Sequence, residues 1–285
     1  MRIPMPGKKQ IDELSISAGA AATRSSATYR QLNRRAWSTL ARERCSSSRP
    51  FDTSCFANAR NILDPFGMLP WSEIKTVLCL AAAGGQQAPL FASLGCEVVS
   101  ADLCSEQLDL DERVANWRGL SIDCLETDML DLSALYGCEF DLVYQAVSAC
   151  YVPDVTRLYT EVARVLRPGG TYRVEHWNPV YLQLADSAWD GQAYRLDRPF
   201  SSTPVPWYSG DNGDHAGWHF MHALGELIGS LCRTGFDIQL FNESPRDAPQ
   251  SAEPGSHEHL ARYLAPFYTV IGRKRSHAQT KGSPR

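Results

Sequence analysis

Short apolar runs alternate with helix-compatible segments through the middle of the chain. The apolar runs predict buried strands at residues 77–80, 98–102, 120–125, 140–144 and 171–177. Segment 88–94 is compatible with a helix, and segment 154–166 places apolar residues on one helical face. The Arg167-Pro168-Gly169-Gly170 sequence ends this second helix. Alternation of this kind predicts βαβ units in an α/β fold.

Small residues and two glutamines follow the first predicted strand directly: Ala81, Ala82, Ala83, Gly84, Gly85, Gln86 and Gln87. Small side chains let a ligand approach the backbone closely. The helix that follows offers N–H groups at its N-terminus. The loop is therefore a candidate ligand-binding element.

Acidic residues mark the ends of the next two predicted strands. Asp102 closes the second strand, where a carboxylate can accept hydrogen bonds from both ribose hydroxyls of a nucleoside. Asp128 follows the third strand and is placed to accept from an adenine amino group, with Met129 packed on the ring. Together with the small-residue loop, these residues predict a nucleoside site.

In this order, the motifs resemble those of the class I S-adenosylmethionine-dependent methyltransferases, over roughly residues 70–180. The loop is similar to the Gly-Gly-Gln-Gln variant of a bacterial small-molecule subgroup. The resemblance implies a Rossmann-like sheet of seven strands in the order 3-2-1-4-5-7-6, with strand seven antiparallel. It implies S-adenosyl-L-methionine as cofactor. The residues expected to bind it are Ala81, Ala82, Ala83, Gly84, Gly85, Gln86, Gln87, Asp102, Leu103, Gln107, Asp128, Met129 and Gln145.

The loop departs from the family pattern in two respects. Cys79 stands where the family usually has an acid, which removes one anchor linked to the amino group of the cofactor. Gln86 or Gln87 is the expected replacement. Ala81 and Ala83 stand where glycines are frequent, so the loop is expected to avoid positive φ angles at both alanines.

The remaining sequence suggests how the chain is organised around this domain. We expect a disordered tail at 1–27, a helical N-terminal cap at 28–70, a methyltransferase domain at 71–274 and a tail at 275–285. In the cap, Trp37 is expected to pack on the sheet rather than to contact a ligand. An aromatic insertion at 178–215 is expected to form a lid. A helix at 218–232 and strands at 236–241 and 267–272 complete the predicted fold.

Catalytic candidates follow the fourth and fifth strands and the insertion. Methyl transfer is a direct displacement, and it needs a base only if the acceptor carries a proton. His176 is the preferred base because imidazole titrates near neutral pH, although it also suits a hydrogen-bonded wall. Its neighbour Glu175 would then face away from the pocket. Tyr151 is expected to contact cofactor or substrate, and His219 to begin the late helix.

Three histidines near that helix offer a metal site as an alternative. His215, His219 and His222 have nearly helical spacing, and three histidines suit zinc or iron. No carboxylate accompanies them in the sequence as in metal-dependent methyltransferases, and a helix that begins at Trp218 breaks the spacing. We therefore expect no metal.

Composition indicates which kinds of partner and which cellular compartment to expect for the protein. The chain has 285 residues, a hydrophobic content of 44% and a net charge of −4, with no basic stripe, which argues against nucleic acid. The sequence has no apolar run long enough to span a membrane and no signal-peptide pattern. Nine scattered cysteines without a CxxC pair favour reduced, buried thiols in a cytoplasmic protein. The oligomeric state stays open.

The sequence thus predicts methyl transfer from S-adenosylmethionine to N, O or C of a small-molecule substrate. One alternative is a catalytically silent regulatory or scaffold protein that binds the same cofactor. Another is a nicotinamide-dependent dehydrogenase, which needs a GxGxxG loop that the chain lacks.

Overall fold

A mixed sheet of seven strands forms the centre of the structure, a computed structural model that describes residues 26–46, 54–81, 84–200, 204–209, 214–244 and 249–276. The strand order is β10-β11-β5-β4-β1-β2-β3, with β11 antiparallel to both of its neighbours. This confirms the predicted order 3-2-1-4-5-7-6. The strand bounds are β1 (Thr76–Leu80), β2 (Glu97–Asp102), β3 (Asp123–Glu126), β4 (Phe140–Gln145), β5 (Leu166–Trp177), β10 (Phe236–Ser244) and β11 (Phe267–Lys274).

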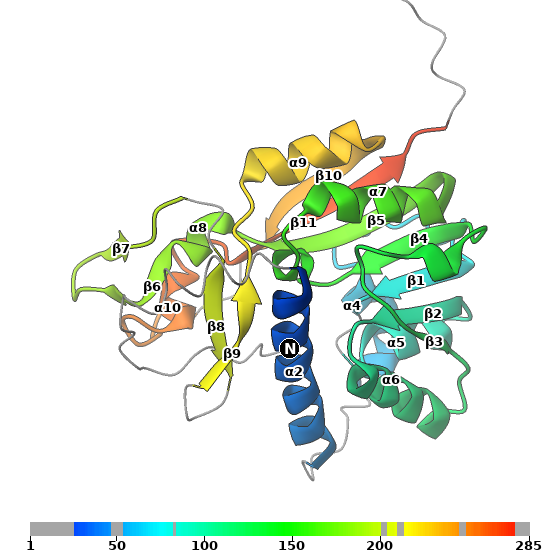
Figure 1. The fold of residues 1–285 in the computed structure, drawn as a ribbon, viewed down its shortest axis with the longest axis horizontal. Helices are drawn as coiled ribbons and strands as arrows, with labels where there is room; N and C mark the ends of the chain where they lie inside the picture. Colours follow the sequence, from blue (N-terminus) through cyan, green and yellow to red (C-terminus); the bar gives the residue numbers. More distant parts are fainter. Residues whose placement is uncertain are drawn as a thin grey trace, which may run out of the picture.

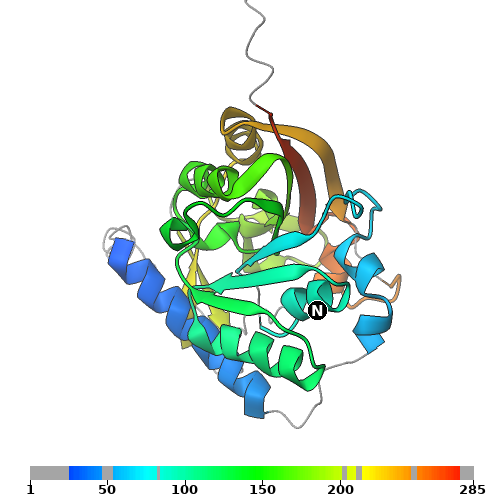
Figure 2. The ribbon, with the colours of Figure 1, turned by 90° about the vertical axis from the view of Figure 1, so that its right-hand side faces the viewer.

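Helices cover both faces of this sheet, as Figures 1 and 2 show. Helices α7 (Val155–Val165) and α9 (Leu224–Arg233) pack on the face that carries Val143 and Val174. Helices α4 (Ala59–Leu63) and α5 (Gln87–Ser93) pack on the face that carries Leu142 and Tyr144. Successive strand residues alternate between the two cores because side chains alternate along a strand. Helix α6 (Ser105–Trp117) packs beside α5 and contacts β2 and β3.

The helix that precedes β5 begins and ends at residues that the sequence marks. The side chain of Asp154 caps α7, because its Oδ1 accepts the backbone N–H of Arg157 at 2.9 Å. After Val165 the backbone becomes extended, and Gly169 adopts a φ of 72°. The predicted helix end is therefore confirmed, and glycine provides the left-handed turn.

The N-terminal cap consists mainly of helix α2 (Ser26–Ser46), followed by α3 (Ser54–Ala57) and α4. Helix α2 lies between α6 and the hairpin β8–β9, so it bridges two separate parts of the molecule (Figure 1). The predicted tails at 1–27 and 275–285 lie outside the described residues, apart from residues 26–27, which belong to α2, and residues 275–276.

The insertion forms two antiparallel hairpins. They are built from β6 (Leu184–Trp189) with β7 (Tyr194–Leu196), and β8 (Val205–Ser209) with β9 (Asp214–His219). The short helix α8 (Pro179–Leu182) leads into β6. The short helix α10 (His257–Leu260) packs near the turn of the first hairpin, where the His259 ring lies 4.9 Å from that of Trp189 and 5.7 Å from that of Tyr194. The predicted helix at 218–232 is wrong at its start, because Trp218 and His219 belong to β9 and the helix begins at Leu224.

Two contacts of Trp218 explain that error: its place in the β8–β9 hairpin and a long-range contact to α2. Oδ1 of Asn33, in α2, accepts the backbone N–H of Trp218 at 2.7 Å, and its Nδ2 donates to the Trp218 carbonyl oxygen at 3.2 Å. Trp218 also pairs with Pro206 of β8, so the Asn33 amide binds this residue in addition to its neighbouring strand. Local periodicity cannot reveal a partner 185 residues away.

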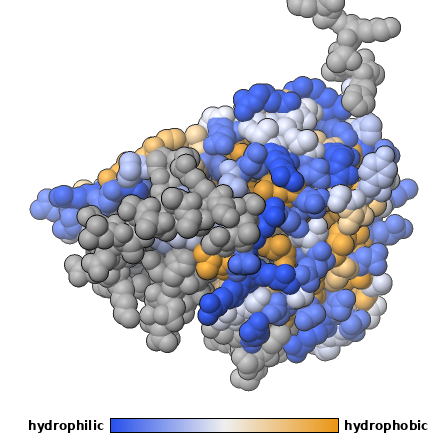
Figure 3. Space-filling view, in the orientation of Figure 1, coloured by the Kyte–Doolittle hydropathy of each residue, from blue (hydrophilic) through white to orange (hydrophobic). Residues whose placement is uncertain are grey.

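Hydrophilic residues dominate the described part of the face in Figure 3, with smaller hydrophobic patches among them. Within the described ranges, no helix combines the length and apolar character needed to cross a bilayer. The cysteines are divided between core and surface: Cys79, Cys104 and Cys150 are buried, whereas Cys138 and Cys232 are exposed. The expectation of buried thiols therefore holds for only part of the set.

Candidate active site

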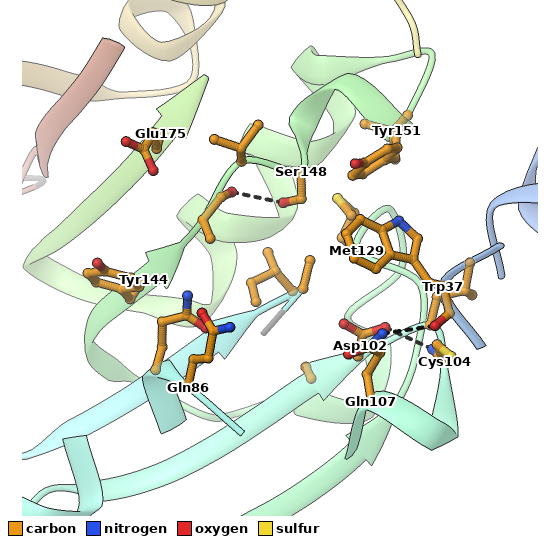
Figure 4. Close-up of a pocket in the computed structure, with 18 of the residues that line it drawn as sticks. Trp37, Gln86, Asp102, Cys104, Gln107, Met129, Tyr144, Ser148, Tyr151 and Glu175 are labelled. Carbon is orange, nitrogen blue, oxygen red and sulfur yellow. Dashed lines mark hydrogen bonds between the residues drawn. The ribbon is translucent and has the colours of Figure 1, made fainter. Parts of the chain in front are cut away.

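A cavity of ≈ 360 Å³ follows the carboxyl edge of the sheet. Its lining includes Ala81 after β1, Asp102 at the end of β2, Asp128 after β3 and Ala146 after β4. The cavity therefore crosses the point between β1 and β4 where the strand order reverses. Open α/β sheets bind ligands at this position. Helix α2 closes one side, and Trp37 lies beside the pocket in Figure 4.

The loop after β1 does not avoid the left-handed region. Ala81 has a φ of 52°, so the expectation of negative φ there is wrong. Its N–H donates to the Ala101 carbonyl oxygen at 2.8 Å, which fixes the residue at the end of the β1–β2 pairing. This bond holds the alanine in a conformation that is unfavourable for an L-residue. Ala82 and Ala83 lie outside the described residues.

The two glycines of the loop shape the pocket without lining it. Gly84 and Gly85 have φ angles of 60° and 78°. A Cβ on Gly84 would clash with Oε1 of Gln107 and lie 2.8 Å from Cδ1 of Leu110. Glycine is therefore required at this position both by backbone angle and by the close approach of α6.

A buried carboxylate lies beneath this loop. Oδ1 of Asp111, in α6, accepts the backbone N–H of Gly85, and Oδ2 accepts from the Ser100 hydroxyl at 2.5 Å. Burial raises the pKa of Asp111 to about 7. Asp111 is not among the residues predicted from the sequence. The signal that marks it is an acid on the apolar face of α6, between Leu108 and Val114.

The residues expected to hold a ribose lie together at the end of β2. Asp102, Leu103 and Gln107 all line the cavity. Oδ1 of Asp102 accepts the backbone N–H of Cys104 at 2.9 Å, which orients the carboxylate. Nε2 of Gln107 donates to the Trp37 carbonyl oxygen at 2.9 Å, so the cap helix is tied to this side of the pocket (Figure 4).

Two buried amide oxygens in the lining lack a hydrogen-bond partner among the described residues. They are Oε1 of Gln87 and Oε1 of Gln107. A buried acceptor without a donor is unfavourable, and a ligand that carries hydroxyl, ammonium or amino donors would satisfy it. A nucleoside with an amino-acid group has such donors, so these residues fit the expected cofactor.

Asp128 and Met129, directly after β3, also line the cavity. Oδ1 of Asp128 accepts the backbone N–H of Leu130 at 2.9 Å, and Oδ2 forms an ion pair with Arg30 of α2 at 2.5 Å. Arg34 and Glu126 form a second ion pair nearby. Helix α2 is therefore attached to the edge of the sheet directly beside the expected adenine position.

Gln145 does not reach the cavity, contrary to its expected role as a cofactor contact. It is buried, its Nε2 donates to the Ser148 hydroxyl at 2.7 Å, and its Oε1 accepts from the Tyr172 hydroxyl. Ser148 does line the cavity and donates to the Ala146 carbonyl oxygen at 3.1 Å. Gln145 therefore holds the turn after β4 in place.

An aromatic cluster forms the wall above this turn. Tyr151 and Trp37 line the cavity, with ring centroids 5.6 Å apart and ring planes at 82°. Trp207 and His219 of the β8–β9 hairpin pack behind Tyr151, at 5.9 Å and 5.1 Å. Among the described residues, the insertion supplies this second layer and none of the lining itself. Trp37 packs on this aromatic cluster and lines the cavity, so the expectation that it packs on the sheet away from a ligand is wrong.

Burial keeps both polar members of this cluster uncharged. It raises the pKa of the Tyr151 phenol well above its usual value, and lowers the pKa of His219 to about 3. His219 does not line the cavity and lies on a strand. Its assignment to a helix start is wrong, and its position makes it a support for Tyr151.

His176 lies on the opposite face of β5 from the cavity. Its Nε2 is 3.3 Å from the Tyr159 hydroxyl, and its ring lies 5.5 Å from that of Tyr268. Burial lowers the pKa of His176 to about 3. Glu175 is the neighbour that faces the cavity (Figure 4). The alternation rule was therefore applied with the wrong phase, and His176 is not carried forward as a base.

The histidines near β9 do not form the helical array that the metal alternative required. His222 follows the strand, and its Nε2 lies 2.8 Å from the Val152 carbonyl oxygen. The His215 side chain lies outside the described positions. In the described part of the chain, no three His, Cys, Asp or Glu side chains are arranged to hold a metal ion.

Arg173 also lines the cavity, beside Glu175, and sequence reasoning did not identify it. Its residue is only 6% exposed, and its guanidinium carbon lies 4.6 Å from the Tyr144 ring centroid. Nη1 of Arg173 is 3.9 Å from Oε2 of Glu175. An Arg and a Glu two residues apart in an apolar strand share one face, and this is the signal that marks the pair.

Part of the chain is similar in sequence to known methyltransferases. Residues 78–174 match a family described as a methyltransferase domain. The uncharacterized methyltransferase YbaJ of Bacillus subtilis is 36% identical over 104 residues, which cover 36% of this chain and 41% of that protein. A demethylmenaquinone methyltransferase of Thermus thermophilus is 36% identical over 107 residues, 37% of this chain and 48% of that protein. The chain thus aligns with less than half the length of either relative.

Solved structures extend the similarity of the fold. An S-adenosylmethionine dependent methyltransferase from Mesorhizobium loti superposes with a TM-score of 0.59 at 24% identity, covering 78% of this chain and 99% of that one. The [4+2]-cyclase SpnF superposes with a TM-score of 0.51 at 16% identity, covering 80% and 85%. The shared fold alone therefore does not define the reaction.

Proposed function

Because the chain carries a class I S-adenosylmethionine-dependent methyltransferase domain, we propose that it transfers the methyl group of this cofactor to a small molecule. The observation that carries the proposal is the single cavity that joins Asp102 and Asp128 to the aromatic wall at Tyr151. Its nucleoside end suits the cofactor, and its aromatic end suits an acceptor. Both ends open into one space, which direct displacement requires.

The residues of the chain divide the binding between polar and apolar contacts. Asp102 accepts hydrogen bonds from the ribose hydroxyls, and Asp128 accepts from the adenine amino group. Leu103 and Met129 pack against the base. The unpartnered Oε1 atoms of Gln87 and Gln107 support this assignment, since they need donors that the described residues do not provide.

The bound cofactor supplies a methyl group activated by a sulfonium. The protein orients the acceptor and excludes water, and Trp37 and Tyr151 are placed for both tasks. Tyr151 stays protonated at neutral pH because burial raises its pKa, so it donates a hydrogen bond and does not accept a proton. The wall favours a planar or apolar acceptor that is methylated on N, O or C.

Two measurements on the purified full chain test the proposal. Titration calorimetry with S-adenosylmethionine and S-adenosylhomocysteine should show binding at one site. Incubation of a metabolite extract with methyl-labelled cofactor should then give a labelled small molecule by mass spectrometry. The labelled product also identifies the acceptor.

Other outcomes separate the alternative functions. Binding of both nucleosides without transfer to any component of extracts would support a silent regulatory or scaffold protein. Binding of NADH with no binding of S-adenosylmethionine would support a dehydrogenase. Failure to bind any of these compounds would overturn the proposed function.

A further inference from the structure

Arg173 is a buried cation whose described surroundings neutralise it incompletely. The residue is 6% exposed, and the only carboxylate oxygen within 4 Å among the described side chains is Oε2 of Glu175, at 3.9 Å. That distance is beyond hydrogen-bonding range. The Tyr144 ring offers a cation–π contact at 4.6 Å. A buried charge is costly unless it is fully paired, so the site favours an additional anion.

The position of Arg173 relates it to the atypical first strand. Cys79 of β1 pairs in register with Tyr144 of β4, and Tyr144 pairs with Arg173 of β5. The three residues form one row across the sheet, and two of them, Tyr144 and Arg173, line the cavity. Cys79 stands where the resembling family usually has an acid. The guanidinium over Tyr144 therefore lies one strand away from the position of the missing carboxylate.

Glu175 completes a charged pair at one end of the cavity. It lies two residues beyond Arg173 on the same strand face, and both residues line the pocket. In Figure 4, Glu175, Tyr144 and Gln86 lie on one side of the pocket, and Asp102 and Gln107 lie on the other. The cation and the anion thus face the part of the cavity beyond the ribose position.

We propose that Arg173 and Glu175 bind the amino-acid end of the cofactor, with Arg173 paired to its α-carboxylate and Glu175 to its α-ammonium group. A zwitterion carries both charges on one carbon, which matches a cation and an anion 3.9 Å apart on one wall. The pair replaces the acid that β1 lacks at Cys79. The inference rests on the proposed function and identifies the residues that anchor one end of its cofactor.

An acceptor that is itself an amino acid presents the same chemical group. The location favours the cofactor, because Gln86 and Gln87 of the loop after β1 line the same cavity, whereas Tyr151 and Trp37 of the acceptor wall lie toward α2. The two sources differ in one testable property. Only the cofactor assignment makes S-adenosylhomocysteine binding depend on Arg173.

The test compares S-adenosylhomocysteine with 5′-methylthioadenosine, a nucleoside thioether that lacks the amino-acid group. Arg173→Met should weaken S-adenosylhomocysteine binding about tenfold to hundredfold in titration calorimetry, because charged hydrogen bonds are lost. Its affinity for 5′-methylthioadenosine should stay within about twofold of wild type, by the same reasoning. Glu175→Gln should show the same selectivity, and Arg173→Lys should restore part of the binding.

Controls separate this effect from damage to the fold. Arg195→Met removes an exposed arginine that pairs with Asp190, outside the cavity, and should bind both ligands like wild type. Circular dichroism should give native spectra for all variants. If Arg173→Met unfolds the protein, the isosteric Glu175→Gln variant, at a partly exposed residue, carries the test.

Three results would overturn the inference. One is unchanged S-adenosylhomocysteine affinity in both folded variants. Another is an equal loss for both ligands, which would indicate a structural role. The third is normal binding of both ligands together with a raised KM for an amino-acid acceptor, which would assign the pair to the substrate. If the wild-type chain binds neither ligand, the proposed function itself fails.

Discussion

Asp111 accepts the backbone N–H of Gly85 through Oδ1, and so ties helix α6 to the loop after β1. The contact is buried and also involves the Ser100 hydroxyl. It fixes the position of a loop whose Ala81 adopts a positive φ. The stability of the ligand-binding loop therefore depends on a residue that does not touch the cavity.

The protonation of Asp111 should make stability depend on pH. Its pKa is raised to about 7 in the fold, above the ordinary value of 3.8, so the folded state retains a proton that the unfolded state releases. The stabilisation is fully present below pH 3.8 and is lost as pH rises through about 7. Asp111→Asn should remove this dependence, which we expect to be on the order of a few kcal/mol.

Denaturant unfolding at pH 5 and pH 8 measures this effect. The difference in unfolding free energy between the two pH values should be larger for wild type than for Asp111→Asn. Other ionisable groups contribute equally to both proteins and cancel in the comparison. Identical pH profiles for the two proteins would show that Asp111 titrates normally.

Asp102→Ala should weaken binding of S-adenosylmethionine. The change removes a charged acceptor for the ribose hydroxyls, which costs about 1.5–3 kcal/mol, or roughly ten- to hundredfold in affinity. Asp109→Ala is a matched control, because Asp109 is an exposed acid nearby on α6 and does not line the cavity. Titration calorimetry distinguishes the two variants, and equal affinities would assign Asp102 another role.

Gly84→Ala should destabilise the fold and impair cofactor binding together. The new methyl group would clash with Gln107 and crowd Leu110, at a φ of 60° that alanine disfavours. We expect the free energy of unfolding to fall by about 2–4 kcal/mol. Urea denaturation and calorimetry measure the two effects.

Gly95→Ala measures the loss of stability that comes from the positive φ alone, without a steric clash. Gly95 has a φ of 86°, and a Cβ there meets no atom within 4 Å. We expect a loss of about 1–2 kcal/mol and normal cofactor affinity. If the free energy of unfolding falls equally in the two alanine variants, the close approach between the loop and α6 does not contribute to the loss in Gly84→Ala.

Asn33→Ala should loosen the contact between α2 and the β8–β9 hairpin. It leaves the buried N–H of Trp218 without the acceptor described above, at a cost of about 1–3 kcal/mol. Hydrogen exchange should accelerate at Trp218, and the melting temperature should fall. Gln31→Ala, an exposed change on the same helix, should alter neither. Unchanged exchange at Trp218 in Asn33→Ala would contradict this assignment.

Much of the sheet could be predicted because its information is local. Strands β1, β2, β4 and β5 are apolar runs bounded by turn residues, and Asp102 follows one such run directly. The third strand is shifted from residues 120–125 to Asp123–Glu126, since a short edge strand carries a weaker pattern. Helix α6 had no predicted counterpart, although it supplies Gln107 and Asp111.

The errors arise where partners lie far apart in sequence. His176 and Glu175 are adjacent, and only the packing of β5 against α7 decides which of them faces the cavity. Trp218 belongs to β9 through its pairing with Pro206 of β8, and its backbone N–H is bound by Asn33, 185 residues away. The pairing of β1, β4 and β5 places Arg173 in one row with Tyr144 and Cys79, although the three residues are far apart in sequence. Single-sequence periodicity contains none of these relationships.

Helix α2 forms part of the cavity wall and is fastened on both sides, by Arg30 to Asp128 and by Asn33 to the hairpin. We expect a ligand as long as a nucleoside joined to an amino acid to leave past this helix, which requires some of these contacts to open. We therefore expect departure of the spent nucleoside to be the slowest event in each cycle, with the rate governed by how often the helix detaches.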